Sequence, residues 1–112
     1  MDTDWISNMA YQRINIEDAY KMITELGPER ALVIDIRDED SFAQGHISSS
    51  EHIDNRNVQE FLDSADLTKP LFVCCYHGNM SQGSAAYLSE KGFEQTYSID
   101  GGYEAWRAIS AQ

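Results

Sequence analysis

The sequence contains few cysteines and no long apolar run. Its two cysteines, Cys74 and Cys75, are adjacent, so they cannot form the disulfide framework of a small secreted domain, and a bond between them would be strained. Such thiols are typical of a reducing compartment. No apolar stretch is long enough to span a bilayer, and residues 1–5 lack the basic and hydrophobic regions of a signal peptide. We therefore expect a cytoplasmic protein.

Basic residues are also scarce. Eight Lys and Arg stand against 19 Asp and Glu in 112 residues, which gives a formal net charge of -11. This acidic balance argues against nucleic acid and against an anionic membrane as partners. An anionic substrate would also be repelled by the protein as a whole, so local backbone amides and a helix end would have to hold it.

Strand and helix patterns alternate along residues 11–112, after a polar lead at residues 1–10. The expected strands are residues 11–14, 31–36, 51–53, 71–74 and 96–99. Three of the expected helices begin after the N-caps Asn15, Asp38 and Asn55. Two more follow the loop at 75–81 and a plain turn at 100–102. The helix before Gly92 is expected to present Ala85, Ala86, Tyr87 and Leu88 on one face. This alternation predicts a single α/β domain with a mainly parallel central sheet of about five strands and helices on both faces.

Residues 71–81 combine an apolar strand, a short polar loop and the start of a helix, with a thiol at the beginning of the loop. A helix start attracts anions, and loop amides that turn inward add a second cradle for negative charge. Cys75 should therefore ionise readily and act as a nucleophile. Cys74 falls inside the strand and is expected to be a small buried hydrophobe.

Other polar residues near the strand ends have more ordinary interpretations. The histidines lack the spacing of a metal site, so we expect none. His46 and His52 are expected to be structural or surface residues. His77 lies in the loop, where it could tune the thiolate, meet an acceptor or face solvent. Asp35 and Arg37 could be catalytic, but an ion pair that braces the strand end is the expected role.

Three ordered segments resemble the signatures of the rhodanese family. The loop reads Cys75, Tyr76, His77, Gly78, Asn79 and Met80, with Ser81 next, and it resembles the family's active-site loop C-x-x-G-x-R. Residues 35–37 with 42–47 resemble the first family signature, and residues 101–106 resemble the closing one. Together the segments extend the resemblance from about residue 32 to the end of the chain.

The resemblance implies a rhodanese-like domain at residues 11–112 that transfers sulfur without a metal or an organic cofactor. Cys75 would take the outer sulfur of thiosulfate or a similar donor, release sulfite and form a persulfide. Cyanide or a dithiol protein, such as a thioredoxin-like one, would then accept the sulfur in a ping-pong sequence. Inward amides of residues 76–81 would bind the anion, and Asp35 and Arg37 would support the site.

Met80 departs from the family pattern, because many relatives carry Arg at that position. A hydrogen bond from a charged group is worth roughly 1.5–3 kcal/mol. Its absence, together with the acidic surface, predicts weak thiosulfate binding.

Three alternatives are less favoured. A non-catalytic rhodanese-like binding or regulatory module is possible, but inactive relatives commonly lose the cysteine that this chain keeps. A phosphatase or an arsenate reductase needs a Cys-x5-Arg loop, and Ser81 stands where that arginine would be. A disulfide oxidoreductase would need a CxxC pair.

Overall fold

A computed structural model describes residues 11–112, and the predicted polar lead at residues 1–10 lies outside this range. The elements in chain order are β1 (Gln12–Ile14), α2 (Ile16–Leu26), β2 (Leu32–Asp35), α3 (Glu39–Gln44), β3 (Glu51–His52), α4 (Val58–Ser64), β4 (Leu71–Cys74), α5 (Met80–Glu90), β5 (Thr96–Ile99) and α6 (Gly102–Ser110). None of the helices in this range is long and apolar enough to cross a membrane.

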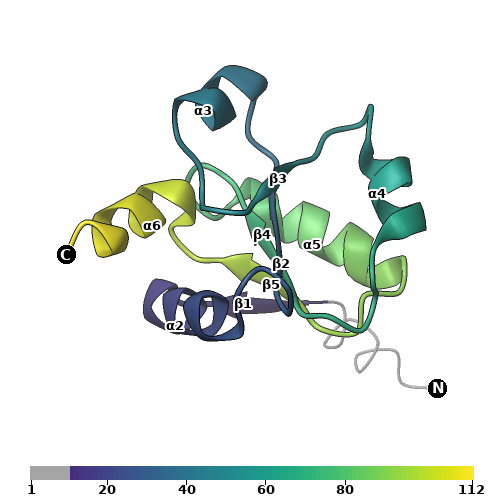
Figure 1. Ribbon diagram of the computed structural model, residues 1–112. Helices are drawn as coiled ribbons and strands as arrows, with labels where there is room; N and C mark the ends of the chain where they lie inside the picture. Colours follow the sequence, from purple (N-terminus) through teal and green to yellow (C-terminus); the bar gives the residue numbers. More distant parts are fainter. Residues whose placement is uncertain (1–10) are drawn as a thin grey trace.

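The five strands form one sheet in the order β1-β5-β4-β2-β3, and every neighbouring pair is parallel. Figure 1 shows the sheet nearly edge-on, with α2 and α6 on one side and α4 and α5 on the other. The predicted fold class is therefore confirmed. Because the strands are parallel, their carboxyl ends meet at one edge, where ligand sites of such folds usually lie.

Strand β4 lies at the centre of the sheet and is fully buried. Its side chains alternate between the faces. Leu71 and Val73 join the core beneath α4 and α5, whereas Phe72 and Cys74 join the core beneath α2 and α6. Cys74 is therefore a core residue, as the sequence predicts.

Two predicted helix caps are present. The side chain of Asn15 accepts a hydrogen bond from the Asp18 N–H over 2.8 Å at the start of α2. The carboxylate of Asp38 accepts one from the Ser41 N–H over 3.0 Å at the start of α3. Each cap satisfies a backbone donor that the first helical turn leaves without a partner.

Two expectations about the helices are wrong. Asn55 does not cap α4, because a turn precedes the helix and Asn57 occupies the N-cap position. The Asn57 side chain instead accepts from the Asp54 N–H over 2.8 Å and so stabilises that turn. Tyr87 does not belong to the buried face of α5 and is 43% exposed. Helical geometry turns it away from the residues that pack on the sheet, which are three and four positions apart.

Candidate active site

The loop between β4 and α5 lies at the carboxyl edge of the sheet and begins with Cys75. Gly78 has a φ of +95°, in the left-handed region. A Cβ atom there would lie 2.8 Å from the Gly101 nitrogen and 3.1 Å from the Ile99 carbonyl oxygen. Only glycine therefore lets the loop pack this closely against the segment that follows β5.

The sulfur of Cys75 lies at the floor of this loop, in a residue that is 1% exposed. The N–H groups of Gly78 and Ser81 both point to Sγ, with 3.2 Å between nitrogen and sulfur. These two are inward amides of the kind expected from residues 76–81. The Ser81 hydroxyl oxygen is also only 3.3 Å from Sγ. Backbone dipoles therefore converge on the atom that would carry negative charge.

The start of α5 reinforces this arrangement. Helix α5 begins at Met80, and the Asn79 side chain makes no capping hydrogen bond. The free amide of Ser81 in the first turn is instead turned toward the sulfur. Residues 75–81 contain no Lys or Arg, so the positive end of the helix and the loop amides supply the favourable field.

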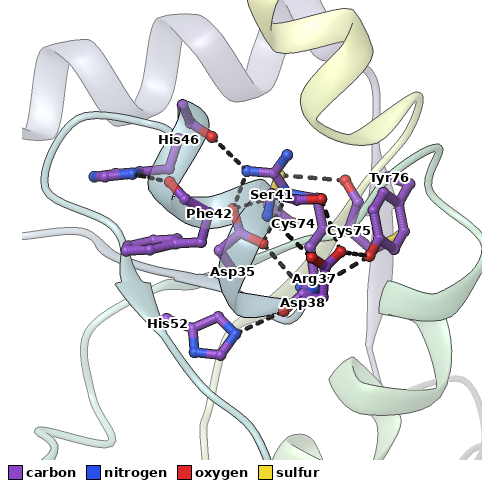
Figure 2. A network of polar contacts seen from close by, with 11 residues as sticks. Asp35, Arg37, Asp38, Ser41, Phe42, His46, His52, Cys74, Cys75 and Tyr76 are labelled. Atoms are coloured by element: carbon purple, nitrogen blue, oxygen red, sulfur yellow. Dashed lines mark hydrogen bonds and ion pairs between the residues drawn. The ribbon is translucent and has the colours of Figure 1, made fainter.

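The ion pair expected between Asp35 and Arg37 is present and buried (Figure 2). Nη2 of Arg37 lies 2.7 Å from Oδ2 of Asp35 and donates to the Gly45 carbonyl oxygen over 2.6 Å. The guanidinium also lies 4.3 Å from the centre of the Tyr103 ring. Burial opposes the charge of Arg37, but the hydrogen bond and attraction of Asp35 outweigh it and raise the Arg37 pKa. The pair thereby connects the end of β2 to α3 and α6.

Residues 15–109 match the family described as Rhodanese-like domain. The chain belongs to the rhodanese-like family. It is 52% identical to a protein named thiosulfate sulfurtransferase GlpE from Ectopseudomonas mendocina over 98 residues, 88% of this chain and 86% of that relative. It is likewise 52% identical to the GlpE of Pseudomonas aeruginosa over 99 residues, with the same coverage of both chains. The crystal structure of a rhodanese-related protein from Thermoplasma volcanium, 27% identical, covers 88% of this chain and 93% of its own with a TM-score of 0.72.

Within this rhodanese-like domain, Tyr76 links the loop that begins at Cys75 to α3. Its hydroxyl donates to the Asp38 carboxylate and accepts from the Asp38 N–H over 3.1 Å (Figure 2). The same carboxylate accepts from the hydroxyl of Ser41 over 2.7 Å. The hydrogen bond from Tyr76, followed by those from Ser41, holds the pKa of Asp38 well below its usual range. The cap of α3 therefore remains anionic and fixes the Tyr76 ring beside the loop.

His77 lies in the loop after β4, and His46 lies just after α3. His77 is exposed, and its Nδ1 lies 3.3 Å from Oε2 of Glu104, which is also exposed. It therefore faces solvent beside the loop, paired with a residue of α6. His46 is structural, because its ring stacks on Phe42 with 3.8 Å between the ring centres and its Nδ1 lies 2.7 Å from the Phe42 carbonyl oxygen.

Within residues 11–112, one group of side chains has the composition of a metal site. Glu39, His52 and Asp54 each place a ligand atom within 4.8 Å of the others. However, Arg56 already forms ion pairs with both carboxylates. The His52 Nε2 atom lies 2.6 Å from the Arg37 carbonyl oxygen. A metal ion would have to displace these contacts, and the expectation that the protein uses none stays a prediction.

Sequence reasoning missed two contributors to the site. Gly102 was expected only to form a turn, but a Cβ atom there would lie 2.4 Å from the Cys75 carbonyl oxygen. Ser98 was assigned no role, yet its hydroxyl lies 2.7 Å from the Ser81 hydroxyl. The available signals were a glycine pair one residue after a strand and a serine within that short, mostly buried strand.

Two depressions flank the loop that begins at Cys75. An apolar groove of about 570 Å³ runs beside α5, and Met80 and Tyr87 line it; they are the exposed large hydrophobic residues of the described chain. The rest of its lining is Ile34, Ile36, Ile53, Asp54, Asn55, Val58, Gly83, Ser84 and Leu88. A polar pocket of about 300 Å³ lies toward α6, where Tyr76, His77 and Arg107 are among its lining residues. The loop that begins at Cys75 thus has an apolar groove on one side and a polar pocket on the other.

Proposed function

We propose that residues 11–112 act as a thiosulfate sulfurtransferase that carries sulfur as a persulfide on Cys75. The observation that supports this most directly is the convergence of two backbone N–H groups on the Cys75 sulfur at the start of α5. Identity of 52% to proteins named thiosulfate sulfurtransferase gives the chemistry independent support. The general reaction needs a sulfur donor and a sulfur acceptor.

In the donor half-reaction, the Cys75 thiolate attacks the outer sulfur of thiosulfate. A bond forms between Sγ and that sulfur while the sulfur–sulfur bond of thiosulfate breaks. The bonding electron pair leaves with sulfite, and the persulfide keeps the remaining negative charge. The amides of residues 76–81 hold the donor anion and the persulfide in turn, with no cationic side chain in the loop.

In the acceptor half-reaction, a thiophilic nucleophile attacks the outer sulfur and Cys75 leaves as a thiolate. Cyanide would leave as thiocyanate, and a dithiol protein of the thioredoxin-like class would leave as its own persulfide. Because the two half-reactions share one covalent intermediate, the kinetics should be ping-pong. The net charge of -11 would favour the approach of a basic acceptor protein.

We also propose a structural role for Asp35 and Arg37 and a cytoplasmic location for the protein. Asp35 and Arg37 act as structural support, because their contacts reach α3 and α6 rather than the sulfur. Both cysteines are free thiols, which fits the reducing environment of the cytoplasm. Neither half-reaction requires a metal or an organic cofactor.

Mass spectrometry after incubation with thiosulfate tests this function. We expect one added sulfur atom, localised to Cys75 by fragmentation of the peptide that carries both cysteines, and no addition in Cys75→Ser. The matched variant Cys74→Ser should still gain the sulfur. An adduct on Cys74 would overturn the assignment, and failure to load sulfur from any donor would favour a non-catalytic module.

A phosphatase is not proposed. Its tetrahedral dianion needs a guanidinium from a Cys-x5-Arg loop, whereas Ser81 occupies that position and its amide is directed at the sulfur. Hydrolysis of an aryl phosphate that depends on Cys75 would contradict this conclusion.

A further inference from the structure

Two buried hydroxyl groups lie in series behind the Cys75 sulfur. The Ser81 hydroxyl oxygen is 3.3 Å from Sγ, and the Ser98 hydroxyl oxygen is 2.7 Å from that of Ser81. Both serines are 0% exposed. They come from different elements, α5 and β5, so the fold and not the loop alone brings them together.

The direction of these hydrogen bonds must depend on the charge of the sulfur. A neutral thiol has a proton to donate, so Cys75 can donate to Ser81 and Ser81 to Ser98. A thiolate has no proton and only accepts. Ser81 must then donate to Cys75, which leaves its oxygen as the acceptor for the Ser98 hydroxyl. The change needs only two O–H rotations and no movement of heavy atoms.

We propose that Ser98 is a positioning residue for sulfur transfer, which directs the Ser81 hydroxyl proton to Cys75 whenever that sulfur is anionic. Ser98 acts through Ser81, and its effect on the turnover of thiosulfate rests on the proposed function. The sulfur is anionic in both half-reactions, first as the nucleophile and later as the leaving group. In each case the serine pair supplies a third donor beside the two amides.

Burial makes this third donor important. Cys75 is 1% exposed, so water contributes little to stabilising its charge, and a buried charge depends on hydrogen bonds from the protein. Hydrogen bonds to ionised groups are about twice as strong as neutral ones. A hydrogen bond from Ser98 also polarises the Ser81 hydroxyl and strengthens its donation to the sulfur.

The pH profile of Cys75 alkylation tests the hydrogen bonding without reference to sulfur transfer. The variants are Ser98→Ala, Ser81→Ala, the double variant, Ser98→Thr and Thr96→Val. For Ser98→Ala we expect the midpoint of the profile to rise by about one pH unit, with about tenfold lower kcat/KM for thiosulfate at neutral pH. Ser81→Ala should have at least this effect, and the double variant should match Ser81→Ala because Ser98 acts through Ser81.

Two variants separate positioning from packing. Thr96→Val removes another buried hydroxyl on the same face of β5, two residues away, and should leave the midpoint unchanged. Ser98→Thr keeps the hydroxyl and should also retain the wild-type midpoint. Additive effects of Ser81→Ala and Ser98→Ala, or an equal shift in Ser98→Thr or Thr96→Val, would overturn the proposal.

The two proposals fail separately. If the wild-type protein acquires no sulfur from any donor but Ser98→Ala shifts the alkylation profile, the sulfurtransferase function fails and the positioning role of Ser98 stands. If sulfur loads on Cys75 but Ser98→Ala leaves both the profile and kcat/KM unchanged, only the Ser98 proposal fails.

Discussion

The backbone N–H of Tyr103 donates a hydrogen bond to the Cys75 carbonyl oxygen, with 2.8 Å between nitrogen and oxygen. This bond ties the start of α6 directly to the first residue of the loop between β4 and α5. The preceding residue, Gly102, has a φ of +59°. A Cβ atom there would also lie 2.6 Å from the Tyr76 carbonyl carbon. The loop can approach α6 only because this position has no side chain.

The substitution Gly102→Ala should therefore displace the loop that begins at Cys75. We expect at least tenfold lower sulfurtransferase activity and a loss of roughly 1–3 kcal/mol in unfolding free energy from the backbone strain alone. Urea unfolding and steady-state kinetics measure the two effects. The control is Gly83→Ala, since a Cβ atom there meets nothing within 4 Å. It should gain roughly 0.5–1 kcal/mol within α5 and keep its activity, and wild-type behaviour of Gly102→Ala would contradict the prediction.

The substitution Met80→Arg should lower the KM for thiosulfate. Met80 is 54% exposed at the start of α5, so an arginine can fit there and add a charged donor beside the loop. A gain of roughly 1.5 kcal/mol corresponds to about a tenfold lower KM.

Tyr87→Arg is the matched control for Met80→Arg. It adds the same charge to the same helix about 10 Å further along the axis, where salt screens it. Its KM should change little. An unchanged KM in Met80→Arg would mean that charge at the loop does not limit thiosulfate binding.

Alkaline pH should destabilise the protein through Cys74. Burial, together with the nearby Asp35, raises the pKa of the Cys74 thiol above its ordinary value. Below the unfolded pKa of about 8.5, the Cys74 thiol is neutral in both states and its stabilising contribution is fully present. As pH rises above that value toward the raised folded pKa, the unfolded thiol ionises while the folded one stays neutral, and the contribution is lost. The loss can reach about 1.4 kcal/mol per pH unit.

Urea unfolding between about pH 7 and pH 11 measures this effect, in a range that spans the unfolded thiol pKa. The free energy of unfolding should fall more steeply with pH in the wild-type protein than in Cys74→Ala. Cys75 is present in both proteins, so the difference between their slopes reports Cys74. Equal slopes would show that Cys74 does not carry the alkaline sensitivity.

Asp35→Asn should destabilise the fold more than it affects the chemistry. It leaves the buried Arg37 guanidinium without its charged partner, which typically costs about 3–5 kcal/mol. In contrast, Glu39→Gln removes an exposed partner of Arg56 and should cost less than about 1 kcal/mol. Protein that remains folded at low temperature should still load sulfur on Cys75, because the ion pair's contacts lead to Gly45 and Tyr103. Loss of loading in folded Asp35→Asn would instead assign the pair a role in positioning the Cys75 loop through Tyr103.

The position of the candidate site could be predicted because its signals are local. The strand, the thiol and the start of α5 all lie within residues 71–81. Parallel strands place Cys75 and Asp35 at one edge without any knowledge of their contacts. The ion pair of Asp35 with Arg37 is equally local, because both residues lie at the end of one strand.

The contributions of Ser98 and Gly102 could not be predicted, because they depend on contacts between segments that are distant in the sequence. Ser98 reaches Ser81 only because β5 pairs with β4 and α5 packs nearby. The hydrogen-bond partner of Ser81 is 17 residues away, and no periodic pattern specifies that distance. The role of Gly102 likewise depends on the packing of the turn before α6 against the loop that begins at Cys75. The error over Asn55 has a different cause, because a turn stabilised by the Asn57 side chain precedes α4 and moves the start of the helix two residues further along the chain.

The alternation of side chains along β4 has a consequence for the two adjacent thiols. Cys74 belongs to the core shared with α2 and α6, whereas the Cys75 sulfur contacts Ser81 of α5. Cys74 is thus a core residue at the end of β4 with a raised pKa, and it is not placed to act as the resolving thiol for a persulfide proposed on Cys75. A sulfur carried on Cys75 would therefore wait for an acceptor from another molecule, such as cyanide or a dithiol protein, and the lifetime of the proposed persulfide would depend on when that acceptor arrives.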